Sequence, residues 1–394
     1  MAETRSVTRS NPLRIGLGEV TGSIADLGIL VPLATALILV NGLDAGSVFV
    51  GVGALLVATG LYFRVPFPVQ PLKALTAVAV AQQLSPDVIH AAGLEIAAFL
   101  LLLSIGDIAN WLARLFTKPV VRALQLGVGV LLVSTAIKMV ADPPEVFRGT
   151  PDSPWPLVLA AAAFAVVAWA SMKKRFGLAL AMLVAGLVAV IVAVQPDLSA
   201  PSFALPHSFS VPAASAFGTA LFLLVIPQLP LTFGNAVVAV NELEHEYFGT
   251  AAAQVSPTRI CVSCAVGNIG SALIGGMPMC HGAGGLTAHY RLGARTAGMN
   301  LLLGGSLIGL ALFFGSQIPE VLGLLPVWVL AGFLAYAGLR HALLVLDLRG
   351  VPLVVAVTAG VLGAWLGNLA VTAGLALVLA HAWSRWGRSQ ANPD

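Results

Sequence analysis

Apolar runs of about 20 residues recur along almost the whole chain, and this feature limits its fold more than any other. A run of this length crosses the hydrocarbon core of a bilayer as one helix. Hydrophobic residues make up 58% of the 394 residues and charged residues only 9%, a composition far from that of soluble domains. We therefore expect an all-α, polytopic membrane protein that is embedded in a lipid bilayer and has no separate soluble domain.

Apolar segments between polar or Pro/Gly-rich breaks number about fourteen, and the third and tenth look too short to cross a bilayer. Lys and Arg fall almost entirely in alternate loops, which places these loops and both termini in the cytoplasm. We expect a multi-pass protein of the inner or plasma membrane. Residues 1–14 then form a cytoplasmic tail rather than a signal peptide. The acidic stretch 241–249 falls in an inner loop, and we expect it to be solvated.

Two stretches in different halves of the chain resemble each other. RVPFPVQPLKALTAVAV (64 to 80) aligns with MPMCHGAGGLTAHYR (277 to 291) when one gap is allowed, so that Pro66 matches Pro278. Paired irregular segments at equivalent places in two halves of a membrane chain point to a transport site. We therefore look for chemistry in these two stretches.

The segments before the matched stretches are also alike. Residues 22–43 and 224–243 are both apolar with Pro, Gly and polar residues at the centre, and we expect both helices to be broken there. An odd number of segments in each half makes the second half enter the membrane in the opposite sense. The expected architecture is an inverted repeat of seven plus seven segments, with halves at 15–194 and 213–384.

Prolines and glycines predict that each matched stretch begins as extended chain and then turns helical. Pro68 and Pro71 forbid a helix across the first stretch, and Gly282, Gly284 and Gly285 weaken one in the second. The helical part of the third segment is too short for a hydrocarbon core about 30 Å thick. We expect half-helices in segments 3 and 10, with their N-termini facing each other near the midplane.

Two facing helix starts form an anion site, because each presents unpaired N–H groups and a partial positive charge. Lys73 would supply a full positive charge beside the first start. Gly282, Gly284 and Gly285 would let an oxyanion approach the backbone closely. Lys73 could instead extend to an interface or pair with a carboxylate, and the glycines could instead serve helix packing alone.

Further candidates surround the same point. Gln70 and His281 can donate hydrogen bonds to oxygen, and the N–H of Leu72 points out of the first helix start. Asp26 is either the counter-ion of Lys73 or part of a proton pathway. His281 could also be a packing residue. Polar side chains in the eighth segment could bind a ligand or cap carbonyl groups, and they are Gln228, Thr232 and Asn235.

Four stretches resemble the molybdate transporters of the sulfate-transporter-like group, which are related to the sulfate permease and uracil permease fold. They are IADLGILVPLATALILVNGLD (24 to 44), VPFPVQPLKALTAVAVA (65 to 81), PLTFGNAVVAVNEL (230 to 243) and MPMCHGAGGLTAHYRLGART (277 to 296). The resemblance implies secondary active transport of a tetrahedral oxyanion, molybdate first and sulfate second. It also implies a homodimer, a core domain from 15–117 and 213–317, and a gate domain from 118–194 and 322–384.

Several alternatives stay open. The MPMCH loop offers thioether, thiol and imidazole groups that suit Cu(I), and the site could also serve another small anion such as bicarbonate. A channel is not separated from a transporter by sequence, and proton co-transport through Asp26 or His281 is a matter for experiment. No hydrolase signature is present, so we expect no enzyme, no cofactor and no nucleic-acid partner. The chain ends soon after its last apolar segment, and no appended regulatory domain is expected.

Overall fold

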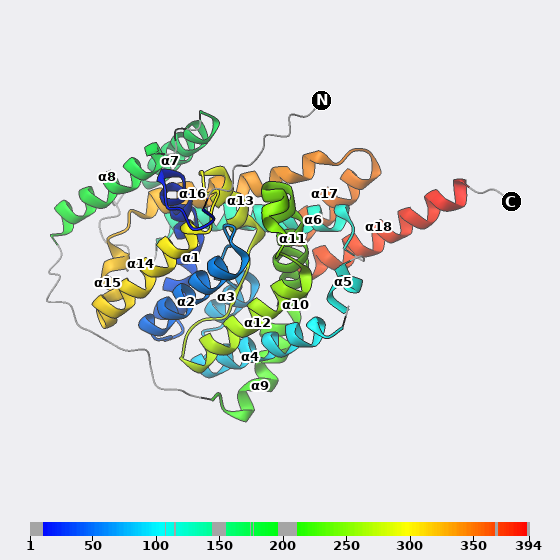
Figure 1. Ribbon diagram of the computed structural model, residues 1–394, viewed down its shortest axis with the longest axis horizontal. Helices are drawn as coiled ribbons and strands as arrows, with labels where there is room; N and C mark the ends of the chain where they lie inside the picture. The colour runs from blue at the N-terminus through cyan, green and yellow to red at the C-terminus, as the bar shows by residue number, and fades with distance from the viewer. Residues whose placement is uncertain are drawn as a thin grey trace.

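The structure is a computed structural model, and it describes residues 11–106, 108–113, 116–143, 155–173, 175, 177–195, 211–366 and 369–391. These residues form a bundle of helices (Figure 1). The bundle contains one short two-stranded ladder. Of the predicted cytoplasmic tail, residues 1–10 lie outside the described part. The statements that follow concern the described residues alone.

The first half of the chain alternates long helices with one extended break. Its elements are α1 (Leu17–Leu39), α2 (Ala45–Phe63), β1 (Gln70–Pro71), α3 (Lys73–Ala81), α4 (Pro86–Ser104), α5 (Ile108–Ala113), α6 (Lys118–Ala141), α7 (Trp155–Met172) and α8 (Gly177–Val194). The second half begins with one long helical run that mixes helix types, made of α9 (Ala214–Ala220), η1 (Leu221–Val225), α10 (Ile226–Leu231), η2 (Thr232–Val238) and α11 (Ala239–Phe248).

The remaining elements again contain one extended break. They are η3 (Gly249–Ala252), α12 (Pro257–Leu273), β2 (Met279–Cys280), α13 (Ala283–Arg291), α14 (Gly298–Phe314), η4 (Gly315–Gln317), α15 (Ile318–Gly323), α16 (Val327–Ala342), η5 (Leu343–Asp347), α17 (Val351–Trp365) and α18 (Leu369–Ala391). The stretches η1 and η2 are π-helical, whereas η3, η4 and η5 are 3₁₀ turns.

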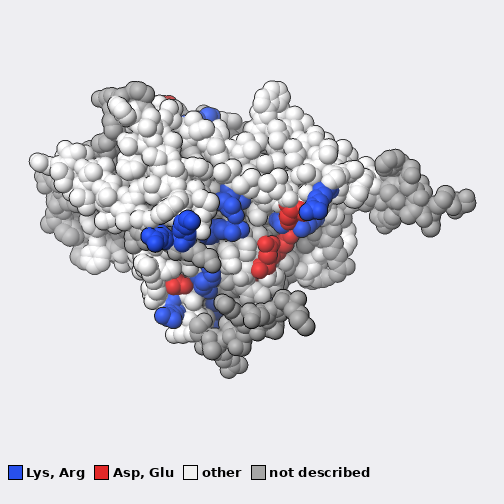
Figure 2. All heavy atoms as spheres, turned by 90° about the horizontal axis from the view of Figure 1, so that it is seen from above, with Lys and Arg blue, Asp and Glu red and all other residues white. Residues whose placement is uncertain are grey.

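Six helices among the described residues are long and apolar enough to cross a bilayer. They lie at Leu17–Ile38, Ala45–Phe63, Pro86–Ser104, Lys118–Ala141, Trp155–Met172 and Val327–Asp347. Shorter apolar helices accompany them, among them α14 and α17. Charged side chains gather in the middle of the face shown in Figure 2, where a short acidic run lies beside the Lys and Arg side chains. Most of the remaining visible surface is uncharged.

Both predicted helix breaks are wrong. The α1 helix runs without interruption from Leu17 to Leu39, and the eighth segment stays helical from Ala214 to Phe248. Proline removes an N–H donor and crowds the preceding turn, and the π-helical turns of η1 and η2 shift the bonding pattern around that defect. A bilayer favours this solution because no water is present to satisfy broken backbone hydrogen bonds.

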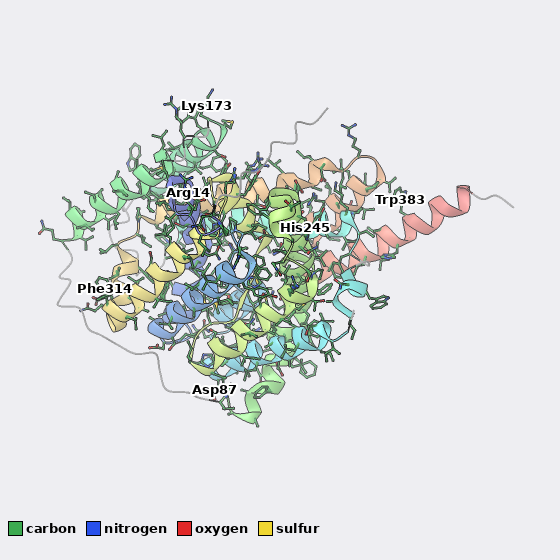
Figure 3. All side chains as sticks on the ribbon, in the orientation of Figure 1. Arg14, Asp87, Lys173, His245, Phe314 and Trp383 are labelled. Carbon is green, nitrogen blue, oxygen red and sulfur yellow. The ribbon has the colours of Figure 1, made fainter. Side chains whose placement is uncertain are left out.

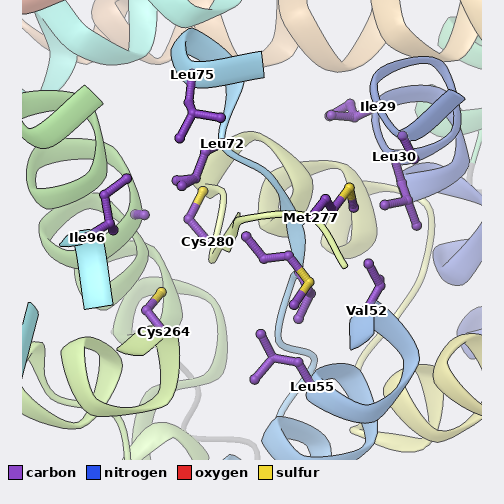
Figure 4. Packing of buried hydrophobic residues seen from close by; sticks show 14 of the residues in the cluster. Ile29, Leu30, Val52, Leu55, Leu72, Leu75, Ile96, Cys264, Met277 and Cys280 are labelled. Carbon is purple, nitrogen blue, oxygen red and sulfur yellow. The ribbon is translucent and has the colours of Figure 1, made fainter. Parts of the chain in front are cut away.

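Helices that are distant in sequence form the closest packing pairs. Helix α2 packs against α14, α4 packs against α12, and α6 packs against both α16 and α17. The largest cluster of buried apolar side chains includes Leu72 and Leu75 from the start of α3 (Figure 4). Met277 and Cys280, from the chain leading into α13, lie in the same cluster (Figure 4). The two short helices therefore begin inside the protein rather than at its surface.

Candidate functional site

The two matched stretches meet in an antiparallel ladder. Gln70 pairs with Cys280, and Pro71 pairs with Met279. The backbone N–H of Leu72 extends the ladder by donating to the carbonyl of Pro278 at 3.2 Å. Helix α3 begins directly after β1, and α13 begins shortly after β2. The predicted change from extended chain to helix is therefore confirmed in both stretches, and the ladder places the two helix starts next to each other.

Two buried asparagines hold the extended chain in place. The side-chain amide of Asn300, on α14, accepts from the N–H of Phe67 at 2.9 Å and donates to its carbonyl at 2.6 Å. Asn268, on α12, does the same with Met279, at 2.8 Å and 2.7 Å. Each side-chain amide thus makes the two hydrogen bonds, to the N–H and to the carbonyl of one residue, that a neighbouring strand would make. Phe67 and Met279 each follow the proline that the sequence alignment matched. The only sequence signal for either clamp is a lone Asn in an apolar helix.

Lys73 brings its charge to the start of the other half-helix. Its ammonium donates to Oε1 of Gln70 at 2.8 Å. A Cβ atom added to Gly282 would overlap that same oxygen and lie 3.0 Å from Nζ of Lys73. Since Gly282 is the N-cap of α13, the side chains of the first stretch lie directly against the helix start of the second. Glycine is required here because any side chain would push Gln70 and Lys73 away.

The first turn of α13 presents backbone donors. Its first intrahelical hydrogen bond runs from the N–H of Leu286 to the carbonyl of Gly282 at 3.1 Å. The preceding N–H groups, of Ala283, Gly284 and Gly285, point out of the helix start. Among the described residues, none outside the helix accepts a hydrogen bond from them. Together with the helix dipole and the Lys73 ammonium, they make the junction strongly electropositive.

His281 connects three parts of the structure. It is fully buried, its Nδ1 lies 2.8 Å from the carbonyl oxygen of Pro68, and its Nε2 lies 2.8 Å from Oγ of Ser263 on α12. The imidazole also packs edge-on against Phe67, with 4.6 Å between ring centroids. Both ring nitrogens are therefore occupied by protein atoms. In this geometry His281 holds the two extended stretches together, which matches the packing alternative raised by the sequence.

Gln228 caps the first turn of α3. Its Oε1 accepts from the N–H of Leu75 at 2.9 Å, and its Nε2 donates to Oγ1 of Thr232 at 3.0 Å. Asn235 lies further along the same helical run, with Oδ1 3.4 Å from Nε2 of His341 on α16. The polar residues of the eighth segment thus support the α3 start and contact α16. Asp26 lies on α1, but its side chain is outside the described part of the structure.

The sequence interpretation missed His341. Its side chain is fully buried, and its ring lies 3.8 to 3.9 Å from the position that a Cβ on Gly284 would occupy. This contact brings α16 to the start of α13. In the sequence, His341 stands at the end of an apolar run beside Arg340, where a histidine reads as an interfacial residue. Only the long-range packing of α16 against α13 reveals its position.

An ion-pair cluster joins the N-terminal parts of α6 and α11 to the end of η5. Arg122 is almost completely buried and binds Asp347, with Nη2 at 2.7 Å and Nε at 3.1 Å from the carboxylate. The same guanidinium lies 3.7 Å from Glu242. The expectation of a solvated acidic loop at 241–249 is wrong in that most of this stretch is helix α11 and Glu244 is fully buried, whereas Glu246 is exposed as expected. The apolar side chains at every third or fourth position of the preceding run continue into α11 and bury that face.

The MPMCH loop is packed as apolar core. Met277, Met279 and Cys280 are all buried in the large hydrophobic cluster. The described residues contain no group of three or more His, Cys, Asp or Glu side chains that could hold a metal ion. A cavity of about 330 Å³ lies elsewhere, between α2 and α12, and its walls are mostly apolar. That lining does not match the chemistry of an oxyanion, so the helix junction remains the candidate site.

Comparison with known proteins identifies the family of this chain. The model of a family described as "Molybdate transporter of MFS superfamily" matches residues 18–132 and 220–340. Molybdate transporter 2 of Arabidopsis thaliana is 31% identical over 387 residues, which cover 88% of this chain and 82% of that protein. Molybdate transporter 1 of Chlamydomonas reinhardtii is 26% identical over 460 residues, with 88% of this chain and 87% of that protein covered.

Solved structures share the fold at low sequence identity. The transmembrane domain of a cyanobacterium bicarbonate transporter, BicA, has a TM-score of 0.59 at 18% identity and covers 92% of this chain and 96% of its own. Murine Solute Carrier 26 family member A9, an anion transporter, has a TM-score of 0.60 at 13% identity, covering 94% and 68%. These likenesses confirm a polytopic helical membrane protein. The chain belongs to the molybdate transporter family, and it is a membrane transporter rather than an enzyme.

Proposed function

We propose that the chain is a secondary active transporter of a tetrahedral oxyanion, with molybdate as the first candidate substrate and sulfate as the second. The observation that carries this proposal is the junction at which the α13 start meets Lys73 and Gln70 across the β1–β2 ladder. Facing N–H groups and a lysine charge suit an anion with several oxygens. The names of the family and of its plant and algal relatives support molybdate.

Each residue has a separate part in this proposal. The N–H groups of Gly284 and Gly285 bind substrate oxygens, Lys73 neutralises charge, and Gly282 keeps the approach open. Gln70 orients the Lys73 ammonium. The remaining residues hold the two stretches in position rather than bind the substrate. Leu72 is hydrogen-bonded to Pro278, His281 to Pro68 and Ser263, and Gln228 to Leu75. Two further positions, Thr232 and Asn235, support Gln228 and His341 respectively.

We assign the fourteen segments to an inverted repeat of seven plus seven, with a core domain from 15–117 and 213–317 and a gate domain from 118–194 and 322–384. The paired asparagine clamps on Phe67 and Met279 support the repeat, because the alignment of the two stretches matches these positions. The exchange of partners between halves, α2 with α14 and α4 with α12, supports it as well. Transport then consists of movement of the core against the gate.

Orientation is part of the same proposal. Arg14 and Lys173 lie toward the same edge of the molecule (Figure 3), and the positive-inside rule makes that edge cytoplasmic. The concentration of Lys and Arg on the face in Figure 2 supports this direction. We place the protein in the inner or plasma membrane with both termini in the cytoplasm, as a homodimer.

Uptake into proteoliposomes tests the function directly. Purified protein is reconstituted and offered molybdate, sulfate, bicarbonate, uracil and Cu(I) separately, with and without a pH gradient. Saturable molybdate uptake that unlabelled sulfate inhibits is the expected result. Bicarbonate uptake without molybdate uptake would move the chain to the activity named for BicA. Copper uptake without an oxyanion signal would reject the proposal, and a non-saturating current would identify a channel.

A further inference from the structure

Helices α2 and α12 touch at one end and separate toward the other. A Cβ added to Gly51 would lie 3.1 Å from Oγ of Ser271, and one added to Gly267 would overlap Leu55. The two helices therefore run antiparallel and are in close contact at these positions. Between the last turns of α2 and the first turns of α12 they move apart, and the cavity of about 330 Å³ lies in the space that opens.

The walls of this cavity are apolar along most of their length and are open on one side. Leu55 and Phe63 of α2 are buried in its floor, whereas Tyr62 of α2 and Val262 and Val266 of α12 are 52%, 39% and 60% exposed. In a membrane transporter, apolar side chains exposed on the outside of helices face the hydrocarbon of the bilayer. The cavity is therefore a groove that opens toward lipid, the α2–α12 groove.

One end of the α2–α12 groove carries a positive charge. Arg259 lies in the first turn of α12, lines the groove and is exposed. Its Nη1 donates to the backbone carbonyl of Gln254 at 3.1 Å and to Oε1 of the same residue at 2.5 Å. These bonds hold one edge of the guanidinium, and the N–H groups of Nε and Nη2 can still donate to an anion. Arg64, exposed directly after the end of α2, adds a second cation at this end.

An apolar groove that ends at a cation matches the chemistry of a phospholipid. The acyl chain of a lipid removes apolar walls from contact with loosely packed hydrocarbon, and its phosphate accepts hydrogen bonds from a guanidinium. In the proposed orientation, Arg259 and Arg64 lie at the cytoplasmic surface, where anionic lipids are concentrated. A zwitterionic headgroup carries its own cation, which competes with Arg259 for the phosphate. An anionic headgroup has no such competitor.

We propose that the α2–α12 groove binds one anionic phospholipid, with an acyl chain along its apolar walls and the phosphate at Arg259. The cavity volume of about 330 Å³ is at the lower end of the range for ligand pockets, about 300–1,000 Å³, so the groove holds one chain rather than a whole lipid. The second chain stays in the bilayer. This site is separate from the helix junction and does not depend on which ion the chain transports.

The floor of the α2–α12 groove is also the back of the helix junction. Ser263 lines the groove, and its Oγ lies 2.8 Å from Nε2 of His281. Phe63 lines it too and stacks on Phe67, with 4.0 Å between ring centroids. A lipid chain in the groove therefore packs against side chains that contact the two extended stretches. Since a ligand that binds only the folded protein stabilises it, the lipid should raise the thermal midpoint of the chain.

Native mass spectrometry of the full chain, released from detergent micelles, counts bound lipids and reports the oligomeric state. The probes are phosphatidylglycerol and phosphatidylcholine with the same acyl chains. One phosphatidylglycerol should stay bound under conditions that remove phosphatidylcholine, and equal retention of the two lipids in the unmodified chain overturns the proposal. Arg259→Gln should lower the ratio of the two bound lipids about fivefold, as expected for one basic residue beside an anionic headgroup. Arg349→Gln, at an exposed arginine that does not line the groove, should leave the ratio unchanged.

A second pair of variants tests the acyl-chain part of the site. Ala58→Trp fills the groove, so it should remove the bound lipid and the rise in thermal midpoint that phosphatidylglycerol causes. Ala54→Trp is the matched control, because Ala54 is exposed on the same helix outside the groove. Equal lipid retention in the two variants overturns the proposal. Loss of a dimer in Ala58→Trp alone would identify the groove as an interface between copies and also overturn it. Size-exclusion profiles show that each variant is folded.

Discussion

Oε1 of Gln228 accepts a hydrogen bond from the backbone N–H of Leu75 at 2.9 Å, across 153 positions of sequence. This contact ties the first turn of a half-helix to a separate long helix. Gln228→Leu should lower the free energy of unfolding by about 1–3 kcal/mol, because a buried N–H group loses its acceptor. It should also weaken molybdate binding through displacement of the α3 start. Thr232→Val removes only the second partner of Gln228, and its thermal midpoint should fall less.

Lys73 carries the charge at the helix junction. Lys73→Met should leave the chain folded and abolish measurable binding of molybdate and sulfate, since a hydrogen bond from a charged group is lost together with the charge itself. Equilibrium binding to purified protein measures this effect. Lys138→Met is the matched control, because Lys138 is an exposed lysine at the end of α6. Equal binding in the two variants would remove Lys73 from the site.

Gly282 separates the two half-helix starts. Gly282→Ala introduces a Cβ that overlaps Oε1 of Gln70 and crowds Nζ of Lys73, so we expect lost oxyanion binding and a lower thermal midpoint. Gly305→Ala is a suitable control, because a Cβ there meets nothing within 4 Å. Both proteins are compared by molybdate titration and thermal unfolding. If Gly282→Ala changes neither molybdate binding nor the thermal midpoint, the side chains at the junction are free to move away from the added Cβ.

The asparagine clamps should be among the most sensitive polar positions of the chain. Asn300→Ala leaves both the N–H and the carbonyl of Phe67 without these partners, and Asn268→Ala does the same to Met279. Each substitution should cost about 2–4 kcal/mol, as expected for two buried backbone groups. Denaturant unfolding in detergent measures this. Asn→Asp at either position sets a buried carboxyl oxygen against the backbone carbonyl, so its loss should be at least as large as that of Asn→Ala.

The Arg122 cluster connects the proposed gate to the proposed core. Glu242→Gln removes a partly exposed partner at 3.7 Å, so its stability effect should stay below about 1 kcal/mol. Arg122→Met removes the partner of two carboxylates and should cost more, on the order of 2–3 kcal/mol. If the Glu242 contact restrains movement of α11 past α6, Glu242→Gln should change the uptake rate more than the molybdate affinity. Proteoliposome uptake and binding, measured side by side, separate these effects.

The two half-helices could be predicted from sequence because proline and glycine act locally. Pro68 and Pro71 exclude helix whatever surrounds them, and Gly282 marks a close approach even before its neighbours are known. Lys73 was a candidate for an equally simple reason, since a lysine in an apolar segment needs a partner. The pairing of β1 with β2 was not predicted from the sequence and is visible only in the structure.

The remaining features depend on contacts between distant segments. Asn300 and Asn268 look like isolated polar residues in apolar helices, and nothing local identifies the backbone groups that they hold. His341 becomes notable only once α16 lies against α13. The predicted break in the first segment failed because α1 stays a regular helix, and the one in the eighth segment failed because π-helical turns conserve the backbone hydrogen bonds there. Local sequence patterns indicate where a regular helix is unfavourable, and contacts between distant segments decide which structure forms.

The β1–β2 ladder also limits how this protein can work. Its strands belong to opposite halves of the chain. Asn300 of the second half is hydrogen-bonded to Phe67 in the first stretch, and His281 of the second stretch is hydrogen-bonded to Pro68. Neither short helix can travel without the other. In the transport that we propose, an ion bound between the two helix starts would therefore stay in an intact site while both short helices move together past the gate domain.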